Sequence, residues 1–98
     1  MDSREFLKLA VETVAAHLNK TLDLHPSAAG AVEPEDVYVV WSCKTLQNAK
    51  AILSTDAVYG ILYELTYNGD KDELYLDEYM KSINRKISLY HPSSKEEK

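Results

Sequence analysis

The feature that most constrains the fold is a run of β-branched and aromatic residues at 37–43, VYVVWSC. Such residues favour an extended backbone, because their side chains pack well on a pleated surface. Apolar side chains fall on both faces of the run, with Val37, Val39 and Trp41 on one face and Tyr38 and Val40 on the other. This pattern predicts a central or covered β-strand.

Three further segments, at 51–55, 58–67 and 72–76, also have the composition of strands. The polar link KTLQN at 44–48 is interpreted as a turn between strands or as a single helical turn. An alternative continues residues 45–53 as a helix, because the apolar residues there also fit a helical period.

Asn68 and Gly69 separate the last two predicted strands and are suited to the positive φ angles of tight hairpin turns. A two-residue turn at this point places Glu64 opposite Glu73, which is unfavourable. A four-residue loop at 68–71 avoids this repulsion and is preferred. It pairs Leu65 with Leu74 and Tyr63 with Leu76.

An amphipathic helix is predicted over residues 4–19, where apolar side chains recur at spacings of three and four, with Ser3 as its cap. Residues 20–35 contain two prolines and a glycine, which predicts a loop. Leu22 and Leu24 within this loop are expected to fold back onto the core.

A closing helix is expected to begin at Asp77, and its apolar stripe consists of Tyr79, Met80, Ile83 and Ile87. Arg85 and Lys86 lie near its C-terminus, where the helix dipole favours cations. The predicted fold class is therefore α+β, in the order α-β-β-β-β-α, with an antiparallel sheet and the N- and C-terminal helices packed on one face. Residues 1–88 form a single α+β domain and residues 89–98 a flexible polar tail.

The chain length and cysteine count narrow the class of protein. Ninety-eight residues suit one domain with one core, and a single cysteine excludes an internal disulfide. The first residues lack the basic segment and apolar stretch of a secretion signal, and the longest apolar run is far shorter than a membrane span. We therefore expect a cytoplasmic protein with no membrane association.

Cys43 is the first residue to consider for catalysis. A reactive thiol needs a histidine, a cation or a helix N-terminus beside it. His17, His25 and His91 lie at no motif spacing from it, and Lys44 points to the opposite face of a strand. We therefore interpret Cys43 as a small buried side chain.

Other chemical motifs are incomplete in this sequence. Asp70-Lys71-Asp72 resembles a fragment of a calcium loop but lacks its glycine and distal glutamate. Glu64 and Glu73, as a pair of carboxylates, are interpreted as surface charge. A zinc pattern, a glycine-rich phosphate loop and a nucleophile elbow are all missing. We predict no catalytic residue, no metal and no cofactor, and hence not an enzyme.

Nucleic acid is not expected as a partner, because the net charge of −5 repels a phosphate backbone. The predicted order of elements is similar to that of double-stranded RNA-binding domains, which carry a lysine cluster at the start of the last helix. Here that position reads Asp77-Glu78-Tyr79-Met80. A nucleic-acid-binding module of this outline remains an alternative, with Lys44 and Lys50 as a small basic spot.

Three stretches resemble a family of small uncharacterised proteins encoded by bacteriophages and prophages of Gram-positive bacteria. These stretches are MDSREFLKLA, DVYVVWSCKTLQNAKAILST and YELTYNGDKDELYLDEY. The family is a domain of unknown function, and the resemblance covers most of the chain outside residues 20–35. It implies a phage accessory protein in the cytoplasm of the bacterial host cell and brings no catalytic residues.

The preferred functional hypothesis is a small protein-interaction module with a host or phage protein as its partner. The candidate partner-binding residues are Trp41, Lys44, Gln47, Asn48 and Lys50, although a core position is preferred for Trp41 itself. Self-association through an exposed strand edge is a variant of this hypothesis. The alternative is an acidic inhibitor of a host nuclease or defence enzyme, with the contact patch Asp70, Asp72 and Glu73 imitating phosphates.

Overall fold

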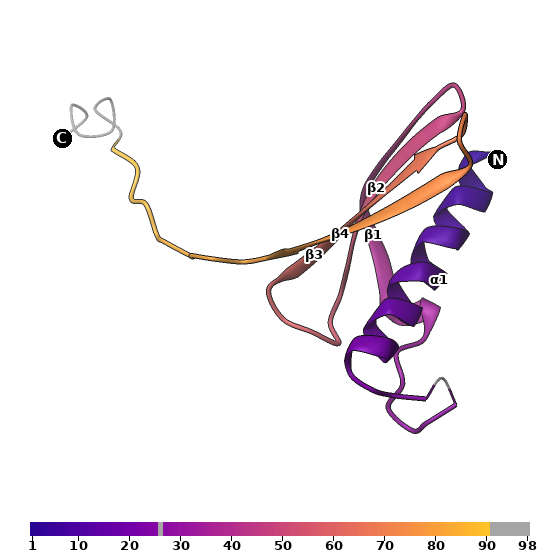
Figure 1. The fold of residues 1–98 in the computed structure, drawn as a ribbon. Helices are drawn as coiled ribbons and strands as arrows, with labels where there is room; N and C mark the ends of the chain where they lie inside the picture. Colours follow the sequence, from indigo (N-terminus) through magenta and orange to yellow (C-terminus); the bar gives the residue numbers. More distant parts are fainter. Residues whose placement is uncertain (26, 91–98) are drawn as a thin grey trace.

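A computed structural model of the protein describes residues 1–25 and 27–90. Helix α1 (Ser3–Thr21) and the short 3₁₀ helix η1 (Pro34–Asp36) precede strands β1 (Val37–Thr45), β2 (Asn48–Thr55), β3 (Ile61–Asn68) and β4 (Glu73–Met80). The strands form one antiparallel sheet in the order β1-β2-β3-β4, and α1 lies across one face of it (Figure 1). The predicted α+β class, N-terminal helix and four antiparallel strands are confirmed.

Helix α1 begins one residue earlier than predicted, because Asp2 and not Ser3 caps it. The Asp2 carboxylate accepts a hydrogen bond from the backbone N–H of Glu5 at 2.8 Å. The Glu5 carboxylate accepts one from the backbone N–H of Asp2 at 3.0 Å. This reciprocal capping box satisfies two backbone donors that the helix itself leaves unpaired.

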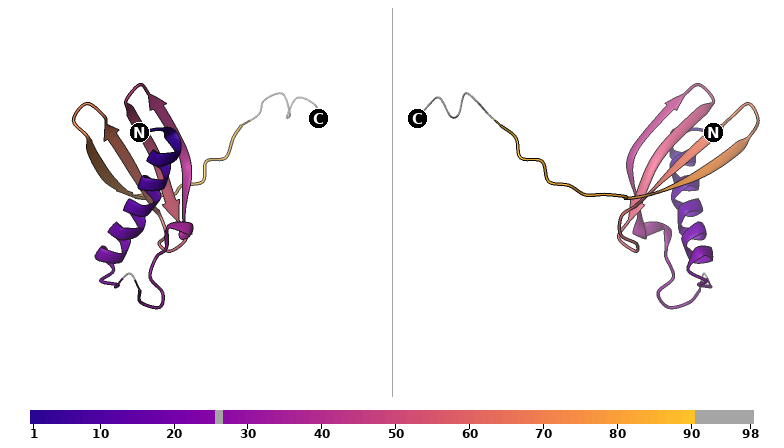
Figure 2. Two further views of the ribbon diagram at one scale, coloured as in Figure 1. Left: turned by 90° about the vertical axis from the view of Figure 1, so that its right-hand side faces the viewer. Right: turned by 60° about the vertical axis from the view of Figure 1, so that its left-hand side comes forward.

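Helix α1 lies against one face of the sheet (Figure 2), and the buried side chains of the core fill the layer between them. Buried residues alternate with exposed or half-buried ones along β2, as expected for a sheet with one covered face. Small side chains on both layers allow a close approach of the helix to the strands. The main buried side chains are Phe6, Ala10, Val14 and Leu18 from α1, and Ala49, Ala51, Leu53, Tyr63 and Leu65 from the sheet.

A side-chain clamp fixes the loop after α1. Asn19 is buried and bonds both backbone groups of Val32, donating to its carbonyl at 2.9 Å and accepting from its N–H at 2.8 Å. Val32 is thereby buried against the core. The prediction that Leu22 folds back onto the core is wrong, since its side chain is exposed.

The link between β1 and β2 is a two-residue turn, Leu46-Gln47, so the helical alternative for residues 45–53 is wrong. Leu46 adopts a φ of 56° at the tip. This left-handed conformation is costly for a side chain with a Cβ atom, and the leucine is exposed.

The hairpin between β3 and β4 has a four-residue loop, as preferred, but at 69–72 and with a different register. Leu65 lies opposite Leu76 and not opposite Leu74, and Glu64 lies opposite Asp77. The prediction that this loop keeps acidic residues from facing each other is therefore wrong. Lys50 and Tyr79 compensate the negative charge of Glu64.

Gly69 is needed in this loop because there is no room for a Cβ atom, and not because its φ angle is positive. The positive φ in the loop belongs to Asp72, at 53°. A Cβ atom on Gly69 would lie 2.2 Å from the carbonyl oxygen of Gln47. The two hairpin tips thus approach each other too closely for any other residue.

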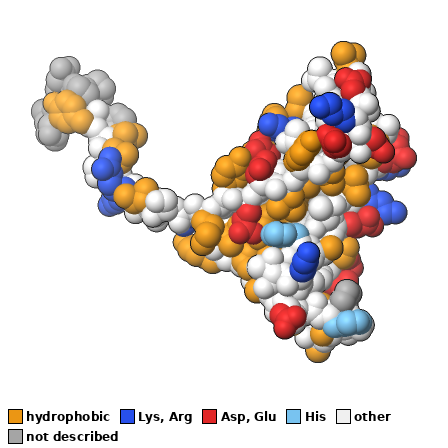
Figure 3. Space-filling model, in the orientation of Figure 1, with side chains coloured by type: hydrophobic (Ala, Val, Ile, Leu, Met, Phe, Trp, Pro, Cys, Tyr) orange, Lys and Arg blue, Asp and Glu red, His pale blue; other side chains and the backbone are white. Residues whose placement is uncertain are grey.

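The predicted closing helix is wrong within the described residues. Residues 73–80 form β4, and residues 81–90 continue from it in an extended path away from the sheet (Figure 3). The spacing of four between Tyr79, Ile83 and Ile87 fits a helix, but it fits the two-residue period of a strand equally well. Pairing with β3 along all of β4 decides between the two. Residues 91–98, most of the predicted polar tail, lie outside the described residues.

Candidate interaction surface

The face of the sheet opposite α1 carries a group of apolar side chains, here called the open face. The strand register shows which residues belong to this face, because directly opposed residues of antiparallel strands point to the same side of the sheet. Trp41 lies opposite Ile52, and Leu62 lies opposite Tyr79. The apolar side chains of the open face are Tyr38, Trp41, Ile52, Leu62, Tyr75 and Tyr79.

A β-bulge in β1 brings Trp41 to the open face. The register with β2 shifts between Val39 and Trp41, so Val39 lies opposite the buried Leu53 whereas Trp41 lies opposite Ile52. Trp41 is 49% exposed, and the preferred core position is therefore wrong. The prediction of a central strand is also wrong, since β1 is an edge strand.

Three polar side chains form a bonded group at the centre of the open face. The Lys50 ammonium lies 3.2 Å from one Glu64 carboxylate oxygen, and the Tyr79 hydroxyl donates to the other oxygen at 2.9 Å. The Tyr79 hydrogen bond and then Lys50 lower the pKa of Glu64, and the same hydrogen bond raises the pKa of Tyr79. Glu64 is thus held as a carboxylate although Asp77 faces it across the strands.

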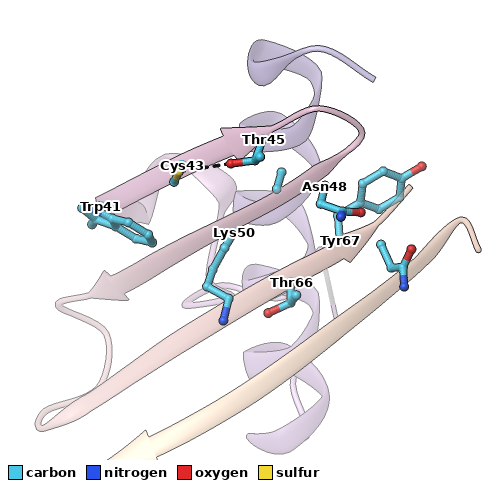
Figure 4. Close-up of a pocket in the computed structure, with 9 residues that line it drawn as sticks. Trp41, Cys43, Thr45, Asn48, Lys50, Thr66 and Tyr67 are labelled. Carbon is cyan, nitrogen blue, oxygen red and sulfur yellow. Dashed lines mark hydrogen bonds between the residues drawn. The ribbon is translucent and has the colours of Figure 1, made fainter. Parts of the chain in front are cut away.

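A hollow of about 380 Å³ lies beside this group, over β1, β2 and β3 (Figure 4). The Trp41 ring stands at one end, and Cys43, Lys50 and Thr66 border the middle. At the other end lie Asn48, Tyr67 and Asn68. The hollow offers an aromatic wall and several polar groups, which suits contact with a polypeptide.

Cys43 lies on the rim of the hollow and is exposed, so its interpretation as a buried side chain is wrong. Its sulfur is 3.9 Å from the Thr45 hydroxyl oxygen. His17 belongs to α1 on the other face, where its Nε2 lies 3.0 Å from a Glu78 carboxylate oxygen, and His25 is bonded to Ser27. The structure therefore does not bring the thiol together with these two histidines.

The five candidate partner-binding residues are divided among three places. Trp41 and Lys50 share the open face, whereas Lys44 lies opposite Ala49 and its amine donates to the Leu46 carbonyl. Gln47 and Asn48 join the two hairpin tips. The Gln47 amide donates to Asp70 at 2.5 Å, and the Asn48 side-chain oxygen accepts from the Gly69 N–H at 3.1 Å.

The acidic contact patch also takes part in local hydrogen bonds. Asp70 accepts from Gln47, Asp72 accepts from the Tyr67 hydroxyl at 2.8 Å, and Glu73 accepts from the Tyr75 hydroxyl. These bonds raise the pKa values of Tyr67 and Tyr75. All three carboxylates remain exposed to solvent.

Sequence reasoning missed the aromatic residues of β4, because it assigned Tyr79 to a helix and gave Tyr75 no role. Tyr75, Asp77 and Tyr79 recur at every second position, and the first two alternate with the aliphatic Leu74 and Leu76, which is the signal of a half-exposed strand that could have identified them. Within the described residues, no group of histidine, cysteine or acidic side chains converges to hold a metal ion. In residues 1–25 and 27–90, no helix combines the length and hydropathy that a membrane crossing requires.

Comparison with known proteins identifies the family. The model of a family of unknown function, DUF6275, matches residues 7–89, and the chain belongs to this family. No curated protein and no solved structure matches the chain.

Proposed function

We propose that this member of the DUF6275 family is a small protein-interaction module without catalytic activity, and that the open face binds a protein partner. The observation that carries the proposal is the group of half-exposed aromatic and aliphatic side chains on a sheet face that no described element covers. Contiguous exposed apolar patches mark interaction sites, and tryptophan and tyrosine supply much of the binding energy at interfaces.

The charges of the chain favour a protein over a nucleic acid as the partner. Residues 1–80 carry fourteen acidic and six basic side chains, and Lys50 on the open face is already paired with Glu64. A phosphate backbone would meet repulsion over most of this surface. An apolar protein surface would meet Trp41 and Tyr75, while the charge of Lys50 stays paired with Glu64.

We place this activity in the cytoplasm of a bacterial cell, with a host or phage protein as the partner. The support is the resemblance of three stretches of the chain to proteins encoded by bacteriophages and prophages of Gram-positive bacteria. In that setting we expect the chain to act by occupying a surface of a larger protein.

The test is affinity capture on the immobilised full chain, followed by measurement of the affinity for the protein retained. We expect Trp41→Ala and Tyr75→Ala to weaken binding roughly thirtyfold each, as for interface residues worth about 2 kcal/mol. Leu22→Ala is the matched control, because Leu22 is a similarly exposed apolar residue outside the open face. Equal binding by all variants, or no retained protein, would refute the proposal.

A second candidate function is inhibition of a nuclease or defence enzyme through the acidic contact patch. Hydrogen bonds from Gln47 and Tyr67 fix the carboxylates of Asp70 and Asp72, which gives a preorganised array of negative charge. The combined change of Asp70, Asp72 and Glu73 to lysine separates the two functions. It abolishes binding to an enzyme that recognises the patch, whereas Trp41→Ala leaves such binding intact.

A further inference from the structure

The C-terminal arm, residues 81–90, has the sequence of a strand but belongs to none of the strands in the part of the chain that the structure describes. Its side chains Ile83, Ile87 and Leu89 are 74%, 67% and 75% exposed. They alternate with polar residues at positions 82, 84, 86 and 88, which is the two-residue period of a half-buried strand. The arm therefore carries an apolar face that no described part of the chain covers.

The sheet has two edges to which a strand can be added, β1 and β4. Strand β1 is interrupted by its bulge and carries Lys44 but no acidic residue. Strand β4 is regular and carries three acidic residues and no basic one. The arm carries three basic residues, Lys81, Arg85 and Lys86, and no acidic one. Charge complementarity thus selects the β4 edge.

The arm prolongs β4 and runs away from the sheet (Figure 1), so it cannot return to the β4 edge of its own chain without reversing. The β4 edge of a second copy is open to it. We propose that two copies of this chain associate through a twofold axis at Lys81, with the arm of each copy paired antiparallel to β4 of the other. The two four-stranded sheets then form one continuous sheet, with both α1 helices on the same face.

The register follows from the side chains. With the axis at Lys81, Arg85 lies opposite the partner's Asp77, and Ile83 and Ile87 lie opposite the partner's Tyr79 and Tyr75. Aromatic residues opposite β-branched ones, and opposite charges, are favourable cross-strand pairs. Moving the axis by one residue in either direction would place an isoleucine opposite Asp77. The arm would therefore extend the open face with apolar side chains.

The two Lys81 side chains meet at the axis, where like charges would repel. Each ammonium is instead drawn towards the β2–β3 loop of its own chain, 2.8 Å from the Tyr59 hydroxyl and 4.4 Å from the centre of its ring. The Lys81 backbone N–H donates to the Gly60 carbonyl at 2.6 Å. These contacts fix the start of the arm in line with β4.

A charge exchange tests the dimer by sedimentation velocity on the full chain. Asp77→Lys alone and Arg85→Glu alone each create two like-charge pairs, and we expect at least a tenfold weaker association of each variant. An equimolar mixture of the two variants restores both attractive pairs, so we expect a heterodimer of wild-type affinity. A monomeric wild-type chain, or single variants that dimerise as well as the wild type, would overturn the proposal.

A cysteine crosslink tests the register in a Cys43→Ser background. Lys81→Cys is expected to form an intermolecular disulfide, because the two Cα atoms face each other at the axis. Ile87→Cys is the matched control, since its two copies would be separated by roughly 40 Å along the strands. Equal crosslinking of both variants would exclude the register. This dimer does not depend on the proposed function, because a chain that dimerises but retains no protein partner would refute only that function.

Discussion

Removing one hydroxyl group is expected to stabilise the protein. Tyr63 is 0% exposed, and no hydrogen bond of ordinary geometry reaches its hydroxyl within the described residues, although the Glu78 carboxylate lies near it. Burying a hydroxyl without a hydrogen bond costs about 1–3 kcal/mol. Phenylalanine keeps the ring and its edge-on contact with His17, in which the two ring centres are 5.8 Å apart. Tyr63→Phe therefore removes the cost of burying the hydroxyl and keeps the packing. We expect the free energy of unfolding to rise by about 1 kcal/mol.

The assay is urea denaturation together with a thermal melt at neutral pH. A gain of about 1 kcal/mol corresponds to a rise in Tm of roughly 4–8 °C for a domain of this size. Tyr67→Phe is the matched control, because it removes a hydroxyl that donates to Asp72 and should lower stability slightly. A loss of stability in Tyr63→Phe would refute the reasoning, since the hydroxyl would then have a partner in solution.

The same residue predicts a dependence on alkaline pH. Burial, followed by the nearby Glu78 carboxylate, raises the pKa of Tyr63 above the ordinary value of 10.0. A raised pKa in the folded state means that the stabilisation is complete below pH 10 and is lost as the pH rises through the folded value. The gain in stability from Tyr63→Phe should therefore increase above pH 10. A constant difference between the two proteins up to pH 11 would contradict the assignment.

Three further predictions concern other contacts. Asn19→Ala should cost about 2–3 kcal/mol in urea denaturation, because it leaves two buried backbone groups of Val32 unpaired; a cost below 0.5 kcal/mol would argue against the clamp. Gly69→Ala should cost about 1–3 kcal/mol, because its Cβ atom would overlap the facing turn, and an unchanged Tm would disprove the close approach. Glu64→Gln should weaken the loss of stability on acidification, because the lowered pKa of Glu64 gives stability that is present above pH 4.5 and lost as the pH falls through the folded value. An acid transition identical to that of the wild type would count against this.

The amino-acid sequence alone determined the type and order of most elements. The helical period of residues 4–19 and the β-branched and aromatic run at 37–43 are local signals, and the structure places a helix and a strand there. Four strands in antiparallel order follow from the same signals and from the turn residues between them. The closing helix failed because a spacing of four residues satisfies both periods, and only the pairing of β4 with β3 separates them.

The composition of the open face was decided by the tertiary structure. One extra residue in β1 turns Trp41 away from the core, and no local pattern announces a bulge, because its position depends on the pairing with β2. Gly69 likewise has its role only because a turn from another hairpin lies against it. The hairpin register placed Glu64 opposite Asp77, which was tolerable because Lys50 and Tyr79 come from neighbouring strands to compensate the charge. Local periodicity thus specifies elements, whereas which faces and residues meet depends on contacts between segments that are distant in the chain.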